Sequence, residues 1–162
     1  MTKLLVLMRH GKAQAPAESG VSSDFEKILS EKGKKDSLTS ALKLIENGFV
    51  KPDLIISSPL VRAVQTAEIV SEAFKKEEIK IETALSGSSD LQSILNCLFN
   101  HFSNCDSLIA IGHQPTMGMT VEYLTGQLIN LGCAGFAYMK LDPCGWKDKK
   151  KNFAHIIKAF NP

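Results

Sequence analysis

Short apolar runs alternate with longer segments of helical periodicity along this chain. Apolar residues dominate positions 4–8, 53–57 and 107–112, and each run ends at a polar or turn-forming residue. Short, bounded runs of branched apolar residues are typical of strands that are buried on both faces. A weaker alternation over residues 79–84 predicts a further strand.

Helices are expected between these strands. Apolar residues recur at i, i+3, i+4 and i+7 from Leu38 to Ile45, which predicts a helix over about residues 30–47. Similar patterns predict helices over residues 59–75, 91–102 and 115–124. Pro59 and Pro115 would each open a helix at the first position, where a proline costs least.

The C-terminal part of the chain follows a different pattern. Residues 135–141 and 153–159 flank a turn rich in Pro, Gly and Lys, as the strands of an antiparallel hairpin do. A β-α-β-α order with one late hairpin predicts an α/β fold of three layers, α/β/α, around a mostly parallel sheet. No repeat or change of composition divides the 162 residues, so we expect a single domain over residues 1–162.

Composition and charge narrow the class of partner. The net charge of +2 is too small to indicate nucleic acid or a membrane as the main partner. No apolar run approaches the roughly 18 residues of a membrane span, and the few apolar residues between Lys3 and Arg9 lead us to expect no secretory signal there. The basic stretch 147–151 is expected to form a solvated turn.

The cysteines bear on metal binding and on the cellular compartment. The chain has four, none in a C-x-x-C pair: Cys97, Cys105, Cys133 and Cys144. Structural zinc sites usually keep such close spacing, so we expect neither a metal site nor a cofactor, although ligands distant in sequence can converge. Free thiols are typical of a reducing compartment, which predicts a cytoplasmic protein. An isolated monomer is the default expectation.

Charged side chains stand where three of the predicted strands end. Arg9, His10 and Gly11 follow the first strand, Arg62 comes shortly after the second, and His113 directly follows the fourth. Parallel strands place these ends at one edge of the sheet, where ligands bind in open α/β folds. Arg62 would lie in the first turn of its helix, where free N–H groups and the helix dipole favour an anion.

Two histidines and two arginines at one edge meet the needs of phosphoryl transfer through a phosphoenzyme. A neutral His10, with an ordinary pKa near 6.5, can attack phosphorus. Arg9 and Arg62 offer planar sets of donors to the phosphoryl oxygens. His113, if protonated, adds positive charge where the transition state needs it. No metal ion is required for this chemistry.

Neighbouring residues are weaker candidates for contact with the phosphate or its leaving group. They are Gly11, Gln14, Ser58 and Gln114. Glycine at position 11 would let a ligand approach the backbone. Residues 11–24 are expected to form a long loop at the same edge, and the sequence leaves open whether this loop or Lys12 selects the substrate. His101 and His155 stand away from the strand ends and are expected to be incidental to catalysis.

Three sequence blocks resemble the histidine phosphatase superfamily related to phosphoglycerate mutase. The matching blocks are residues 7–13, 57–67 and 111–115, and residues 24–33 look most like the small SixA-type phosphohistidine phosphatases. The resemblance implies a phosphoglycerate mutase-like fold. It also implies that His10 accepts the phosphate and that Arg9, Arg62 and His113 form the phosphate pocket. Lys27 and Ile28 depart from the family pattern, which has arginine and proline there.

The segment after the third strand bears on the substrate. Larger members of the superfamily carry a catalytic glutamate and a lid there, whereas residues 83–90 contain a single carboxylate, Asp90. Asp90 directly precedes a helix, so it could be the N-cap or a general acid, and the N-cap is favoured. A serine phosphate expels an alkoxide, which needs a proton donor. Phosphohistidine expels an imidazole, whose conjugate acid has a pKa near 6.5, so the missing acid favours a P–N substrate.

The leading interpretation is a phosphatase acting on phosphohistidine in phosphorelay or phosphotransfer proteins, without nucleic acid or membrane partners. A broader small-molecule or phosphoserine/threonine phosphatase on the same scaffold is the alternative enzyme. A mutase is less favoured, because nothing in the sequence indicates a lid. From another class, the chain could bind phosphorylated partners without turning them over. His10 argues against that reading, because a binding module needs no nucleophile.

Overall fold

A six-stranded sheet forms the middle layer of the structure, a computed structural model that describes residues 2–143, 145 and 151–162. The strand order is β3-β2-β4-β1-β5-β6. The strands are β1 (Lys3–Arg9), β2 (Leu54–Ser57), β3 (Ile79–Ile81), β4 (Ser107–Gly112), β5 (Phe136–Leu141) and β6 (Ala154–Phe160). β1 to β4 run parallel, while β5 pairs antiparallel with both β1 and β6. The expected mostly parallel sheet with a C-terminal antiparallel hairpin is therefore confirmed.

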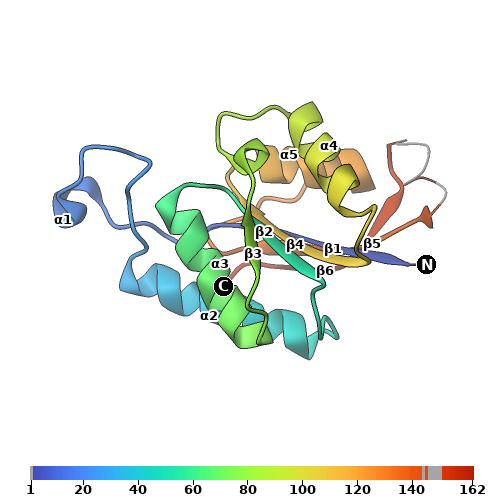
Figure 1. The fold of residues 1–162 in the computed structure, drawn as a ribbon, viewed down its shortest axis with the longest axis horizontal. Coiled ribbons are helices and arrows are strands. Elements are labelled where there is room, and N and C mark those ends of the chain that lie inside the picture. Colours follow the sequence, from blue (N-terminus) through green and yellow to red (C-terminus); the bar gives the residue numbers. More distant parts are fainter. Residues whose placement is uncertain (1, 144, 146–150) are drawn as a thin grey trace.

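Helices cover both faces of the sheet, which confirms the three-layer arrangement (Figure 1). α2 (Glu31–Glu46) and α3 (Val61–Phe74) lie on one face, and α4 (Leu91–His101) and α5 (Thr116–Thr125) lie on the other. Alternate side chains of β1 enter the two cores: Leu5 and Leu7 pack on the α4–α5 side, whereas Val6 and Met8 pack on the α2–α3 side. Burial on both faces explains why this strand reads as a continuous apolar run.

The register of the parallel strands places their carboxyl ends side by side. Arg9, the last residue of β1, pairs with Gly112, the last residue of β4. Ser57, the last residue of β2, pairs with Ile111 of β4. The residues that follow β1, β2 and β4 therefore leave the sheet at the same edge, as expected from the sequence.

Side-chain caps fix where two of the helices begin. Ser30 accepts a hydrogen bond from the N–H of Gly33 and caps α2, and Asp90 accepts one from the N–H of Ser93 and caps α4. Each cap satisfies a backbone donor that has no partner within its helix. The expectation that Asp90 is an N-cap is thus confirmed.

Several expected boundaries were wrong. β3 ends at Ile81 and a 3₁₀ turn, η1 (Thr83–Leu85), follows, because this turn brings Leu85 into the core at 1% exposure. α3 begins at Val61, not at Pro59, because Ser58 Oγ accepts from the N–H of Leu60 and prolongs the turn.

Two further expectations, the start of α5 and the loop after β1, need correction. α5 begins at Thr116, with Pro115 as its N-cap, one residue later than expected. The loop expected over residues 11–24 contains a short helix, α1 (Pro16–Ser19).

Most of the basic stretch 147–151, and Cys144, lie outside the described residues. None of the described helices is long and apolar enough to cross a membrane.

Candidate active site

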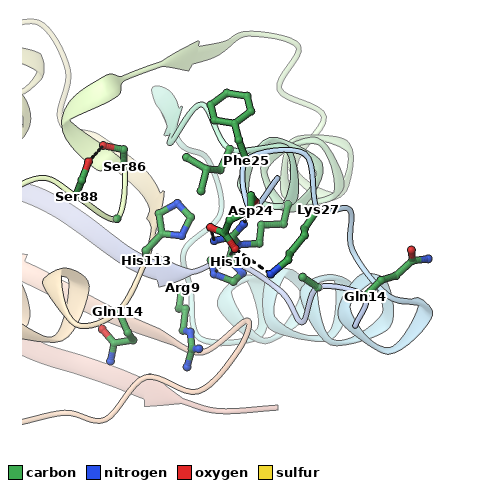
Figure 2. A pocket seen from close by; sticks show the side chains of 14 residues that line it. Arg9, His10, Gln14, Asp24, Phe25, Lys27, Ser86, Ser88, His113 and Gln114 are labelled. Atoms are coloured by element: carbon green, nitrogen blue, oxygen red, sulfur yellow. Dashed lines mark hydrogen bonds and ion pairs between the residues drawn. The ribbon is translucent and has the colours of Figure 1, made fainter. Parts of the chain in front are cut away.

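The carboxyl edge of the parallel strands carries a cavity of about 660 Å³ (Figure 2). Its lining includes six of the residues selected from the sequence, which are Arg9, His10, Gln14, Arg62, His113 and Gln114. These residues come from three distant parts of the chain, after β1, β2 and β4. The convergence expected from parallel strand ends is therefore present in the structure.

His10 presents one nitrogen with a free electron pair. Its Nδ1 lies 2.7 Å from the carbonyl oxygen of Gly11, which can only accept, so Nδ1 carries the proton. Burial is the main cause that lowers the pKa of His10 to about 4, so the ring is neutral at neutral pH. A neutral ring with its proton on Nδ1 has its lone pair on Nε2. The side chain is thereby prepared to act as a nucleophile through Nε2.

Arg62 holds its guanidinium beside that nitrogen. Its Nε donates to His10 Nε2 over 3.2 Å, while Nη1 and Nη2 donate to the carbonyl and carboxylate of Asp24 over 2.7 and 3.0 Å. Three of the five N–H groups are used in this way, and two are left for a ligand. The hydrogen bond from Arg62 is the main cause that lowers the pKa of the Asp24 carboxyl.

Arg9 lies at the end of β1 and contributes a second guanidinium to the cavity lining. Its Nη1 donates to the carbonyl of Leu131 over 3.2 Å, and Figure 2 shows the group turned away from the ring of His113. Arg9 Nε is buried and has no hydrogen-bond partner within the described part of the chain. A buried charged donor without a partner is costly, and an anion is the kind of acceptor that would relieve it.

His113 faces His10 across the cavity. The two ring centroids are 4.8 Å apart and the rings are tilted by 54°. His113 Nε2 lies 2.7 Å from the hydroxyl oxygen of Ser58. Burial, followed by the charge of Arg62, lowers the pKa of His113 to about 4. In the free cavity His113 is therefore neutral at pH 7, and the imidazolium considered from the sequence would need an anion nearby to raise its pKa.

The weaker candidates separate into cavity residues and supporting residues. Gln14 and Gln114 line the cavity, whereas Ser58 is fully buried outside the lining and contacts His113. Gly11 is also outside the lining. A Cβ at Gly11 would lie 2.6 Å from Ser37 Oγ, so its small size lets α2 approach the loop after β1. The structure thus gives Gly11 a packing role against α2, and its contact with a ligand stays a prediction.

Asp90 does not reach the cavity. Its side chain is exposed at the N-terminus of α4, and its Oδ1 accepts from the N–H of Ser93 over 2.7 Å. Among the described residues, the cavity lining contains one carboxylate, Asp24. The position that was considered for a general acid is therefore used as a helix cap.

Eight of the lining residues were not among the candidates selected from the sequence. They are Ala13, Asp24, Phe25, Lys27, Leu60, Ser86, Gly87 and Ser88. Asp24 pairs with Lys27 over 3.1 Å as well as with Arg62. The sequence pointed to these residues only through the segments in which they lie. Residues 24–33 resemble the SixA-type chains, and Ser86 and Ser88 lie in the shortened segment after β3.

Comparisons with known proteins agree with this geometry. A family model described as the histidine phosphatase superfamily (branch 1) matches residues 5–87. An uncharacterized protein of Picosynechococcus sp. is 32% identical over 136 residues, which are 81% of each chain.

Solved structures share the fold over nearly the whole chain. A structure of the protein histidine phosphatase SixA complexed with tungstate has a TM-score of 0.82 at 22% identity, covering 97% of this chain and 96% of that one. A putative phosphohistidine phosphatase SixA from Agrobacterium tumefaciens has a TM-score of 0.79 at 24% identity, covering 99% and 98%. At these identities the likeness establishes the fold.

Proposed function

The chain belongs to the histidine phosphatase superfamily, and we propose that it removes the phosphoryl group from phosphohistidine on phosphorelay or phosphotransfer proteins. The observation that carries the proposal is the lone pair of His10 Nε2, held in a cavity beside the guanidinium of Arg62. The proposal assigns the activity to one domain over residues 1–162, acting as a cytoplasmic monomer without a cofactor.

In the first step, His10 Nε2 attacks the phosphorus atom of the substrate. A new P–N bond forms to His10 while the P–N bond to the substrate imidazole breaks. The departing ring leaves as neutral imidazole when its other nitrogen holds a proton taken from water. Arg62 must release Nε2 as the phosphoryl group enters, and its N–H groups then face the phosphoryl oxygens.

In the second step, water attacks the phosphorus on His10 and the P–N bond to Nε2 breaks. The electron pair returns to Nε2, the proton lost by the attacking water passes to bulk water, and inorganic phosphate leaves. The cationic groups of Arg9 and Arg62 offset the negative charge in both steps. A phosphoryl dianion would also raise the pKa of His113 above its value in the free cavity, so that this ring could supply a further hydrogen-bond donor.

The acid–base content of the cavity supports a P–N substrate. Its one carboxylate among the described residues, Asp24, is ionised and bound to Arg62 and Lys27. A phosphate ester would require a proton donor for its alkoxide, and neither His10 nor His113 carries a spare proton in the free cavity. A phosphohistidine substrate needs no donor in the cavity, because the other nitrogen of its ring takes a proton from water and the ring then leaves as neutral imidazole.

The cavity rim supports a protein as the carrier of the phosphoryl group. Phe25 lines the cavity and leaves 49% of its surface exposed, and Lys27 lies beside it in sequence. An exposed aromatic ring next to a cation offers both apolar and polar contact to a peptide around the modified side chain. The rim therefore suits a phosphohistidine displayed on a protein surface.

The substrate class is tested by comparing three substrates with wild-type protein and His10→Ala. We expect phosphate release from a phosphohistidine peptide to exceed release from a phosphoserine peptide and an aryl phosphate, and to be lost in the variant. Equal or faster turnover of the serine or aryl ester would overturn the substrate and favour a broader phosphatase. Binding without turnover, unchanged by His10→Ala, would favour a module that recognises phosphorylated partners.

A further inference from the structure

Three potential metal ligands meet on the α4 side of the sheet, outside the cavity lining. They are Glu82, Cys97 and His101, and one ligand atom from each lies within 4.8 Å of the other two. Cys97 and His101 are four residues apart on α4 and therefore share one face of that helix. Glu82 comes from the segment between β3 and η1, so the cluster joins two elements.

The backbone holds these side chains in place. The N–H of Glu82 donates to the carbonyl of Ser57 over 2.8 Å, which fixes Glu82 at the end of β2. Its carboxylate Oε1 lies 2.6 Å from His101 Nε2. Cys97 is 9% exposed, and the side chains of His101 and Glu82 are 18% and 30% exposed. The cluster is thus mostly buried, with some access to water through His101 and Glu82.

We propose that Glu82, Cys97 and His101 form a binding site for a divalent transition-metal ion of the Zn²⁺ class. A sulfur, a nitrogen and a carboxylate oxygen together are the donors that Zn²⁺ takes, and three protein ligands leave the fourth tetrahedral position to water. The existing hydrogen bond between His101 and Glu82 already brings two of these donors together. A bound ion would take the place of the proton between them, and the neutral His101 ring would then carry its proton on Nδ1.

The cysteine must lose its proton for the site to form. Burial, followed by the charge of Glu82, raises the pKa of the Cys97 thiol to about 12, so the metal-free thiol is protonated at neutral pH. Coordination forms the metal–sulfur bond and releases the thiol proton to solvent.

The ion would act on the fold and not on the phosphoryl group. Glu82 directly precedes η1, and Ser86 and Ser88 after η1 line the active-site cavity. Coordination would tie this segment to α4 and so stiffen one wall of the cavity. The site stands apart from the proposed catalysis, and its failure would leave the proposed phosphatase function untouched.

The test is a titration of the purified full chain with Co²⁺, followed by competition with Zn²⁺. We expect one Co²⁺ to bind with a thiolate-to-cobalt charge-transfer band, Zn²⁺ to displace it, and Zn²⁺ to raise the melting temperature. Cys97→Ser should abolish the band and weaken binding at least about tenfold, and His101→Gln should weaken binding similarly. Near-UV circular dichroism checks that each variant is folded.

Two matched controls each test another residue of the same type, one thiol and one histidine. Cys105→Ser removes a half-buried thiol whose Sγ lies 3.3 Å from the carbonyl of His101 but which is outside the cluster, and it should leave binding unchanged. His10→Ala removes a histidine of the cavity and should also leave binding unchanged. No stoichiometric binding by the wild-type protein, or a charge-transfer band that survives Cys97→Ser, would overturn the proposal.

Discussion

Arg62 Nε lies 3.2 Å from His10 Nε2, the nitrogen that carries the lone pair of that ring. The contact means that the proposed nucleophile is held by the same group that would bind the phosphoryl oxygens. A substrate therefore displaces a hydrogen bond as it enters and gains a guanidinium already in place.

Replacing Arg62 by lysine should lower kcat/KM by about two to three orders of magnitude, because one ammonium cannot contact His10, Asp24 and a phosphoryl group together. Steady-state kinetics with a phosphohistidine peptide measures the loss, and circular dichroism confirms the fold. A loss of less than about threefold would show that Arg62 has no part in transition-state binding.

Asp24 affects the cavity in two separable ways, through its negative charge and through the hydrogen bonds that it accepts from Arg62. Asp24→Asn removes the charge but keeps an oxygen for Arg62 Nη2, so inhibition by orthovanadate should tighten by a few-fold as repulsion of the anion falls. Asp24→Ala also removes the side-chain acceptor, so kcat should fall by roughly tenfold. Weaker orthovanadate inhibition in Asp24→Asn would contradict this division.

Ser58 is a positioning residue, because its hydroxyl lies 2.7 Å from His113 Nε2 and is fully buried. Ser58→Ala should destabilise the fold by about 1–3 kcal/mol, since a buried ring nitrogen loses its partner. It should also lower kcat more than it changes KM. Ser58→Thr retains a hydroxyl and should recover part of the activity, whereas equal effects of both substitutions would point to packing alone.

The stability of the fold should decrease as the pH falls from about 6.5 to about 4. His10 and His113 each have a pKa of about 4 in the folded chain, against 6.5 for an ordinary histidine. Between these values the unfolded chain binds more protons, so stability that is complete above pH 6.5 is lost as the pH falls toward 4. Each ring contributes roughly 3 kcal/mol to this loss.

Urea unfolding of wild-type protein and of the double variant His10→Asn, His113→Asn at about pH 7.5 and about pH 5 measures this dependence. The variant should show the smaller loss of stability on acidification. Parallel losses in the two proteins would show that the histidines are not buried in neutral form.

Gly11→Ala should reduce stability before it reduces catalysis. A Cβ there would lie 2.6 Å from Ser37 Oγ and 2.7 Å from the carbonyl oxygen of Gly33, so α2 must move. Overpacking of this kind costs about 1–3 kcal/mol. Thermal melting measures the cost, and kcat/KM at a temperature where the variant is folded should stay within about threefold of wild type. A stable but inactive variant would instead indicate that a ligand approaches the backbone at Gly11.

The sequence predicted which residues meet at the carboxyl ends of the parallel strands, but not which residues of the neighbouring loops and helices contact them. Apolar runs that end at Arg9 and Gly112 marked strands buried on both faces, and parallel pairing then brought the residues after them together. Asp24 lies in an irregular loop, where no periodicity shows that it contacts Arg62. The role of Gly11 depended on where α2 packs, which is a tertiary property.

The cluster of Glu82, Cys97 and His101 shows the same limit. The four-residue spacing of Cys97 and His101 places both side chains on one face of a helix. Their contact with Glu82 depends on how β3 ends, which the sequence does not show. β3 is an edge strand with exposed residues, so its sequence shows only a weak alternation of apolar and polar residues. The 3₁₀ turn η1 forms where Leu85 is buried in the core, which local sequence does not show. Local patterns therefore located the elements but not the contacts between their ends.

The position of phosphate on the trapped enzyme shows directly whether His10 is the phosphate acceptor. Wild-type protein mixed with a phosphohistidine peptide and quenched at alkaline pH, where phosphohistidine survives, is digested and mapped by mass spectrometry and ³¹P NMR. We expect phosphate on Nε2 of His10, appearing within one turnover and absent from His10→Ala. Turnover without phosphate on His10, or phosphate on His113 instead, would contradict it.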